Sequence, residues 1–351
     1  MARATARPKT KADSSPRPDS GELAWKSAGD PLFGFSVAPL IAEGMVFIGQ
    51  RGGTFYALNL ADGTRKWEFK AGAPILNCAA YDAGQVFFCD ENLYMHCLDA
   101  KTGREVWKSE RLYGQSTKQY CPVVVNGHVI FRPMAAHPFT EPIVPAKQWE
   151  AIKGHITPAG VAADGGLSQP LMDFQDAMVK FYQQRPSLRD LFILDEKTGK
   201  EAFIAPHWPS VLALPGGAGP AAFDGKQSII LPWRFNAFNA YWGRLDLKRQ
   251  RFVEVFAPKT IVGNPDETVN VSVGGKVLFI MHCQEGNCQY TGIYDLEKKV
   301  CYDVPGRWER QWTLSDCCQS GNNAASIADG RFYHIIFHDL WAWTSAGGGQ
   351  R

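Results

Sequence analysis

The stretch GTFYALNLADGTRKWEFK, residues 53–70, is followed about forty positions later by NLYMHCLDAKTGREVWKSE, residues 92–110. Both segments begin with residues typical of β-strands, pass through a turn that contains Asp and Gly, and then carry a Trp. Self-similarity at a fixed period of this length is the signature of a repeat architecture. The two copies therefore indicate a supersecondary unit that the chain uses more than once.

Each copy extends to four short segments with the character of β-strands. The first unit covers residues 36–72 and the second covers residues 77–110, and in both the apolar runs are bounded by Gly or Asp-Gly. Such turns join antiparallel strands into hairpins. Four antiparallel strands in about forty residues form one blade of a β-propeller.

Fainter copies begin near residues 121, 220, 269 and 324. The fourth strands are counted by the residue at the Trp position, which is Trp25, Trp67, Trp107, Phe203, Phe252 and Tyr302. The last copy ends after three strands, and residues 21–29 match the fourth-strand pattern. We therefore expect the N-terminal strand to pair with the last blade and to close the ring, which leaves no sheet edge exposed. The count predicts an all-β propeller of six blades, with seven or eight as the open alternatives.

Two segments stand outside the repeat. Residues 1–20 are basic and rich in Ser and Pro, and they lack the apolar centre of a signal peptide, so we expect a disordered leader or a start that has lost its signal. Residues 133–190 are an insertion in the third blade, and the rest of 21–351 is expected to be a single propeller domain. Within the insertion, helical spacing is shown by Leu171, Phe174, Met178 and Phe181. This helix is expected either to cover the central funnel as a lid or to pack along one side.

Composition limits the classes of partner. Lys and Arg number 37 and Asp and Glu number 35, a balance that argues against nucleic acid or an anionic membrane surface. No apolar run has the 18 or more residues of a membrane helix. The nine cysteines show no disulfide framework. Several fall in strands and are expected to be small buried thiols, namely Cys78, Cys89, Cys97 and Cys121.

The segments YALNLADGTRKWEF and CLDAKTGREVWKS resemble the repeat of pyrroloquinoline-quinone-like (PQQ-like) β-propellers. That superfamily includes the outer-membrane assembly lipoprotein of the β-barrel insertion machine and the quinoprotein alcohol dehydrogenases. The motif residues themselves are expected to be structural, since Asp and Gly make the turn and the Trp packs between blades. This interpretation covers Trp67, Trp107, Asp99 and Gly103.

Binding is expected on the loops that join each fourth strand to the next blade and each second strand to the third, because loops over a rigid scaffold carry function. Aromatic, Arg, Asn and His side chains on these loops suit a protein or peptide, or a small molecule in the funnel. The candidate residues at this funnel mouth are Arg111, Lys118, Tyr120, His207, Trp208, Trp233, Arg234, Trp308, Arg310, Trp312, Asn322 and Asn323.

The favoured hypothesis is a non-catalytic scaffold for a protein or peptide partner, which the resemblance to the assembly lipoprotein implies. No catalytic residue, metal site or cofactor is expected. The alternatives are a carbohydrate- or small-molecule-binding propeller and a quinoprotein dehydrogenase that uses PQQ and calcium. For the dehydrogenase, the sequence offers Asp316, Trp312, Asn322 and Asn323, with the adjacent Cys317 and Cys318 as a candidate redox pair.

The same resemblance bears on localisation. Relatives with this repeat are typically exported, so we expect an extracytoplasmic or periplasmic protein whose leader is not in this chain. A reducing cytoplasm is the alternative, because it would suit the nine cysteines.

Overall fold

The computed structural model describes a set of segments that fall into two compact units. The described residues are 26–27, 34, 37–117, 121–134, 167–206, 221–234, 240–256, 263–273, 276–283, 288–298, 300–303, 326–328, 331–336 and 339–344. The first unit comprises residues 4–133 and 191–203, and the second comprises residues 1–3, 134–190 and 204–351.

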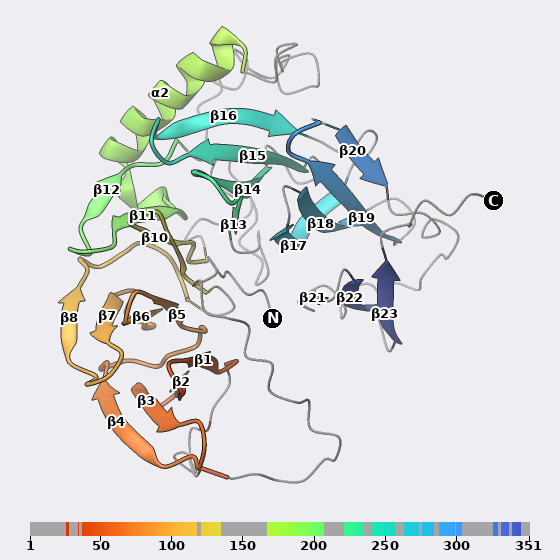
Figure 1. Ribbon diagram of the computed structural model, residues 1–351. Coiled ribbons are helices and arrows are strands. Elements are labelled where there is room, and N and C mark those ends of the chain that lie inside the picture. Colours follow the sequence, from red (N-terminus) through yellow and green to blue (C-terminus); the bar gives the residue numbers. More distant parts are fainter. Residues whose placement is uncertain are drawn as a thin grey trace. The chain divides into compact units, whose positions relative to one another are not determined.

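The first unit contains three four-stranded antiparallel sheets within its described residues (Figure 1). Blade 1 consists of β1 (Leu40–Ala42), β2 (Met45–Gly49), β3 (Thr54–Asn59) and β4 (Arg65–Lys70). Blade 2 consists of β5 (Ala80–Asp82), β6 (Gln85–Cys89), β7 (Met95–Asp99) and β8 (Glu105–Lys108). Blade 3 consists of β9 (Val123–Val125), β10 (His128–Phe131), β11 (Phe192–Asp195) and β12 (Glu201–Phe203).

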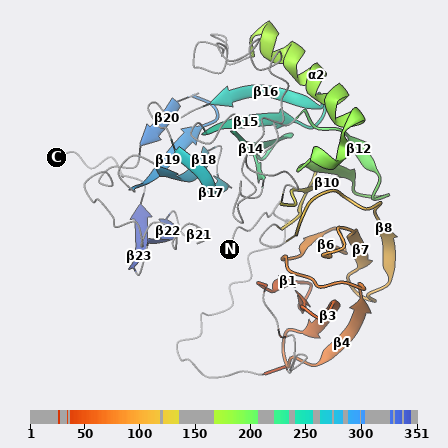
Figure 2. The ribbon, with the colours of Figure 1, turned by 180° about the vertical axis from the view of Figure 1, so that it is seen from behind.

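The second unit continues the same pattern over its described residues (Figure 2). Blade 4 consists of β13 (Ala222–Phe223), β14 (Ser228–Arg234), β15 (Ala240–Asp246) and β16 (Arg251–Phe256). Blade 5 consists of β17 (Gly263–Val273), β18 (Lys276–Cys283), β19 (Cys288–Asp295) and β20 (Val300–Asp303). The last sheet has β21 (Ser326–Ala328), β22 (Arg331–Ile336) and β23 (Asp339–Thr344).

Strands pair in chain order in every one of these sheets, so each blade is a meander of hairpins. The predicted fourth strands are confirmed for five blades, whose marker residues are Trp67, Trp107, Phe203, Phe252 and Tyr302. The last sheet shows three described strands, as the sequence predicts. Trp25 lies outside the described residues, so the predicted closing strand remains a prediction. The sheets are blades of the β-propeller type.

Aromatic side chains connect blades 1 and 2 within the core of the first unit. Phe47, Phe55 and Phe88 are fully buried, and the Phe55 and Phe88 rings of blades 1 and 2 stack with centroids 4.1 Å apart. Ile75, from the connection between these two blades, belongs to the same cluster and is also fully buried. Burial of each such side chain contributes roughly 1.5–3 kcal/mol, so packing between blades is a main source of stability.

The turns between first and second strands share one conformation. The two central residues have positive φ in all three blades of the first unit, at Glu43–Gly44, Ala83–Gly84 and Asn126–Gly127. This is the pattern of a type I′ turn, whose twist matches that of the flanking strands. Asn tolerates the left-handed conformation well, whereas Glu and Ala adopt it at a cost. The strain therefore falls in blades 1 and 2.

The predicted helical insertion is confirmed as α2 (Gln169–Gln184), with Pro170 in its first turn. Leu171, Phe174 and Met178 are buried as predicted, but the fourth buried position of the apolar face is Tyr182, and Phe181 is half-buried. No helix among the described residues has both the length and the apolar character needed to span a membrane.

Helix α2 packs along the outer edge of blade 4, beside β16 (Figures 1 and 2). The Gln175 Nε2 donates to the Phe252 carbonyl at 3.1 Å, and the Phe252 backbone N–H donates to Gln175 Oε1 at 2.7 Å. Arg251 also pairs with Asp176 at 3.2 Å. Of the two predicted placements, the structure shows the helix packed along one side of its own unit.

Candidate functional site

The turn between third and fourth strands connects neighbouring blades of the first unit. The Trp67 Nε1 donates to the Ala100 carbonyl of blade 2 at 3.0 Å, and the Trp107 Nε1 donates to the Glu196 carbonyl of blade 3 at 2.8 Å. Each indole ring lies against the Gly of the same turn, so that a Cβ at Gly103 would be 2.6 Å from Trp67. The predicted structural role of the Trp and Gly residues is confirmed here. The contact fixes each turn against its neighbouring blade.

The Asp at the start of these turns organises the backbone. Asp99 Oδ1 accepts hydrogen bonds from the Thr102 backbone N–H at 2.8 Å and from the Thr102 hydroxyl at 2.7 Å. Asp195 and Thr198 repeat both bonds in blade 3, at 2.9 and 2.7 Å. The Thr side-chain hydrogen bond is the main reason that the pKa of each Asp lies below its usual value. Both carboxyls are therefore charged at neutral pH.

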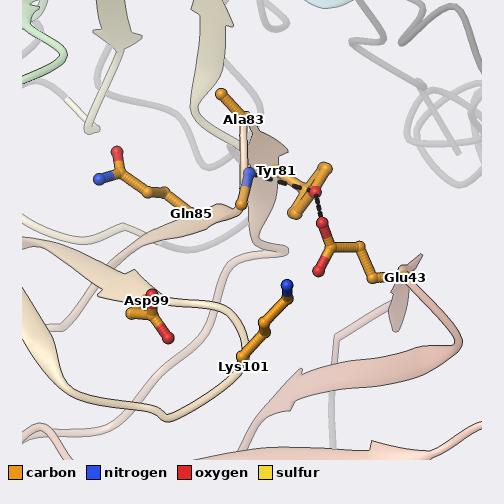
Figure 3. A pocket seen from close by; sticks show the side chains of 7 residues that line it. Glu43, Tyr81, Ala83, Gln85, Asp99 and Lys101 are labelled. Atoms are coloured by element: carbon orange, nitrogen blue, oxygen red, sulfur yellow. Dashed lines mark hydrogen bonds between the residues drawn. The ribbon is translucent and has the colours of Figure 1, made fainter.

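A pocket opens where the turns of blades 1 and 2 meet (Figure 3). Its volume is about 440 Å³, and it is open to solvent on one side. We call it the turn pocket, and its lining consists of Glu43, Tyr81, Ala83, Gly84, Gln85, Asp99 and Lys101. It lies at the end of the blades where first strands turn into second strands and third into fourth. The predicted funnel mouth lies at the other end, so the turn pocket is an additional site.

Tyr81 and Glu43 connect the two blades across this pocket. The Tyr81 hydroxyl donates to Glu43 Oε1 at 2.5 Å and accepts from the Gly84 backbone N–H at 3.1 Å. Burial first, and then the hydrogen bond to Glu43, raise the pKa of Tyr81 to about 12. The phenol therefore stays protonated and keeps the Glu43 carboxylate in place.

The pocket offers charges of both signs. Figure 3 shows the Lys101 side chain extending toward Tyr81 and Glu43, with Asp99 and Gln85 along the wall. The strained residues Glu43 and Ala83 also line it. Backbone strain concentrates at functional sites, and here it coincides with the pocket. Such a lining can hold a polar peptide segment by hydrogen bonds and charge pairs.

A carboxyl pair lies at the same end of the unit, between blades 2 and 3. Burial first, and then the charge and hydrogen bond of Asp82, raise the pKa of Glu196 to about 7. Glu196 is therefore about half-protonated at neutral pH, because a second negative charge close to Asp82 is unfavourable. The Glu196 backbone carbonyl also accepts the hydrogen bond from Trp107 Nε1. The Asp82–Glu196 pair is therefore part of the contact between blades 2 and 3.

A third polar group, missed by the sequence analysis, is buried at the other end of blade 2. His96 Nε2 lies 3.1 Å from Asp90 Oδ2 and its Nδ1 lies 3.0 Å from Glu105 Oε2. The imidazole is 1% exposed and stacks on Phe88 with centroids 5.1 Å apart. The only signal in the sequence was a His between the apolar residues of a core strand.

The predicted funnel-mouth residues are covered only in part. Arg111 is exposed after β8 in the first unit, and Trp233 and Arg234 end β14 in the second unit, opposite Tyr241 and Ala240. Arg111 therefore belongs to one unit, whereas Trp233 and Arg234 belong to the other. The others lie outside the described residues, namely Lys118, Tyr120, His207, Trp208, Trp308, Arg310, Trp312, Cys317, Cys318, Asn322 and Asn323.

Four-stranded meander blades, with an Asp- and Gly-containing turn and a Trp that packs on the next blade, are similar to the PQQ-like β-propeller repeat. Comparison with known proteins agrees with this class over the first two blades. Residues 16–107 match the family model described as outer membrane protein assembly factor BamB. A stretch of 92 residues is 28% identical to the outer membrane protein assembly factor BamB of Alkalilimnicola ehrlichii. It covers 26% of this chain and 23% of that protein, so the match spans about a quarter of the relative's length.

Solved structures with a similar arrangement include BamB from Moraxella catarrhalis, at 11% identity and a TM-score of 0.44 over 94% of this chain and 88% of that one. They also include a quinohemoprotein alcohol dehydrogenase from Pseudomonas putida HK5, at 13% identity and a TM-score of 0.48. That alignment covers 89% of this chain and 52% of the dehydrogenase chain.

Proposed function

We propose that this chain is a non-catalytic propeller scaffold that binds a protein or peptide partner during protein assembly in the cell envelope. One observation carries the proposal: every residue that lines the turn pocket, from Glu43 to Lys101, lies within residues 16–107, the segment that matches the outer-membrane assembly factor. The segment with the family likeness is therefore also the segment that presents a site.

The surroundings of the pocket suit a peptide. Ile41, two residues before Glu43, is 57% exposed, and Leu60, whose backbone N–H donates to the Gly44 carbonyl at 2.9 Å, is 39% exposed. Apolar side chains beside a polar, hydrogen-bonding cleft are typical of surfaces that bind protein segments. In this proposal the partner places a polar or charged side chain in the turn pocket and an apolar side chain against Ile41 and Leu60.

The proposed location is extracytoplasmic, on the periplasmic side of an outer membrane, where assembly factors with this repeat act. Fractionation of cells that express the natural gene tests the location directly. Recovery of the protein in the cytoplasmic fraction alone would contradict an envelope role.

Site-specific photo-crosslinking tests the partner. Lys101 is replaced by the photoreactive p-benzoylphenylalanine in the native host, and adducts formed on irradiation are identified by mass spectrometry. The matched control places the same group at Lys248, an exposed lysine in the β15–β16 turn. We expect an adduct at position 101 with an outer-membrane assembly component or a precursor of an outer-membrane protein. Equal labelling at both positions, or none at 101, would reject the turn pocket as the binding site.

The quinoprotein alternative is tested by titrating the purified chain with PQQ and calcium, followed by a dye-linked alcohol oxidation assay. The residues offered for it, Asp316, Trp312, Asn322 and Asn323, lie outside the described residues. We expect neither calcium-dependent quinone binding nor turnover. Micromolar binding with turnover would replace the scaffold proposal by an oxidoreductase.

A further inference from the structure

Two cysteines occupy equivalent places in neighbouring blades. Cys78 lies two residues before β5 and Cys121 lies two residues before β9, and these two first strands are in contact. Their thiols are joined by a hydrogen bond, and both side chains are half-buried. The sequence predicted buried thiols at Cys78, Cys89, Cys97 and Cys121, but of these four only Cys89 and Cys97 are fully buried. The repeat has therefore placed two partly buried thiols side by side.

Blade 1 also contributes to this site, through its backbone. Ala38, two residues before β1, is the equivalent residue of blade 1, and its backbone hydrogen-bonds the Cys78 sulfur. A bond that lowers a thiol pKa is donated to the sulfur, so the donor is the Ala38 N–H. Three consecutive blades thus meet at the Cys78 sulfur.

The two thiols differ in acidity in the way that a reactive pair requires. The hydrogen bond from Cys121, aided by the backbone of Ala38 and opposed by burial, lowers the pKa of Cys78 to about 7. The same hydrogen bond, together with burial, raises the pKa of Cys121. Burial raises the pKa of Cys97 to about 12. Since the thiolate is the reactive form, Cys78 is the nucleophile of the pair and Cys121 the resolving thiol.

We propose that Cys78 and Cys121 are a redox-modification site, at which a reversible disulfide links blades 2 and 3. The oxidant is another disulfide, either a small molecule such as oxidised glutathione or a protein disulfide. The pair lies at the opposite end of the first unit from the turn pocket, so the inference does not rest on the proposed function.

The exchange is balanced in two steps. The Cys78 thiolate attacks one sulfur of oxidised glutathione, which forms a mixed disulfide and releases one glutathione thiolate. Cys121 then loses its proton to solvent and attacks the Cys78 sulfur, which forms the protein disulfide and releases the second glutathione. Two electrons pass from the protein thiols to the oxidant, and closure brings the two sulfurs to about 2.05 Å.

The first test maps disulfides in the full-length protein after equilibration with glutathione mixtures of increasing oxidising ratio. Digestion with trypsin and chymotrypsin separates Cys78 from Cys89 and Cys97, because Tyr81 lies between them. We expect the peptide that links Cys78 to Cys121 to be the main product. We also expect its formation to raise the thermal midpoint by about 5 °C, as a native cross-link does. Cys97→Ala is the control and should keep the link. Free Cys78 and Cys121 at every ratio, or links from Cys78 to other cysteines, would overturn the proposal.

The second test does not require the disulfide to form. The pH dependence of iodoacetamide labelling at Cys78 should have a midpoint near 7 in the reduced protein. In Cys121→Ala the midpoint should move toward the ordinary thiol value of about 8.5, because the hydrogen bond to the thiolate is lost. An unchanged midpoint in that variant would mean that Cys121 does not act on Cys78, and the pair would be rejected.

Discussion

The turn before the fourth strand is built in two ways in this chain. In the first unit Gly103 and Gly199 have φ of 72° and 67°, and in the second unit Gln250 has φ of 58° at the same place. All three donate their backbone N–H to the carbonyl of the Asp four residues earlier, at 2.8–2.9 Å. The turn itself therefore does not require Gly. In the first unit the indole ring of a neighbouring blade packs on the turn and leaves no room for a side chain. A Cβ at Gly199 would be 2.3 Å from Trp107.

Removal of the Trp should break this contact most completely. Trp107 is 8% exposed and donates to the Glu196 carbonyl, so Trp107→Ala removes a large buried ring and a hydrogen bond. We expect a loss of about 3–5 kcal/mol in the free energy of unfolding, measured by urea titration. Trp107→Phe should lose clearly less, since most of the ring contact with Gly199 is kept. Equal losses would show that ring packing is not the main term.

Substitution of the Gly tests the close approach directly. Gly199→Ala should destabilise by about 3 kcal/mol, from the left-handed backbone and from the clash with Trp107. Gly127→Ala is the matched control, because Gly127 has a φ of 77° but nothing within 4 Å of its Cβ position. It should cost only about 1 kcal/mol. A similar loss in both variants would mean that the backbone conformation alone selects Gly.

The residue after the Asp distinguishes the turns by charge, since blade 3 has Glu196 where blade 4 has the buried Leu247. The folded pKa of Glu196 is about 7, above its ordinary value of 4.5. Its favourable contribution is therefore full below pH 4.5 and is lost as the pH rises through 7. Glu196→Gln stays neutral, so its stability relative to wild type should increase over this window. Because Glu196 is only half-buried, screening limits the change to about 1 kcal/mol.

The measurement for Glu196 is the midpoint of urea unfolding at pH 4.5, 6 and 8. Asp82→Asn is the second variant, and it should lower the pKa of Glu196 and flatten the pH dependence. A wild-type profile that does not change over this range would contradict the raised pKa of Glu196.

The smallest effect is expected at Gln250, in the turn before the fourth strand of blade 4. Gln250→Gly relieves the left-handed strain but loses chain entropy, so we expect a net gain of about 0.5 kcal/mol. Gln250→Ala keeps the strain and should be neutral. A clear loss in Gln250→Gly, detected by urea unfolding, would show that the Gln side chain itself stabilises the second unit.

The blades could be predicted because their determinants are local and repeated. Asp99, Gly103 and Trp107 lie within nine residues, and the pattern recurs one blade later, so the turn and the strand could be located without the structure. The weak fourth strands at Phe203, Phe252 and Tyr302 followed by analogy.

The turn pocket could not be predicted in this way. Its central hydrogen bond joins Glu43 to Tyr81, 38 residues apart, and it depends on the register between two blades. The buried face of α2 could likewise be predicted only in part from the sequence. Leu171, Phe174 and Met178 follow the apolar spacing. Gln175 is also buried, because its side-chain amide hydrogen-bonds the backbone of Phe252, and no apolar pattern indicates such a contact.

The paired bonds of Gln175 have a further consequence for how copies of this chain meet. The side-chain amide presents one donor and one acceptor to the backbone of Phe252, as a residue of an adjoining strand would. The backbone N–H and carbonyl of Phe252, at the edge of blade 4, are therefore already hydrogen-bonded within the chain. At Phe252 the helix therefore blocks the edge of blade 4 from pairing with another strand, which other proteins achieve with lysines or prolines on the edge strand.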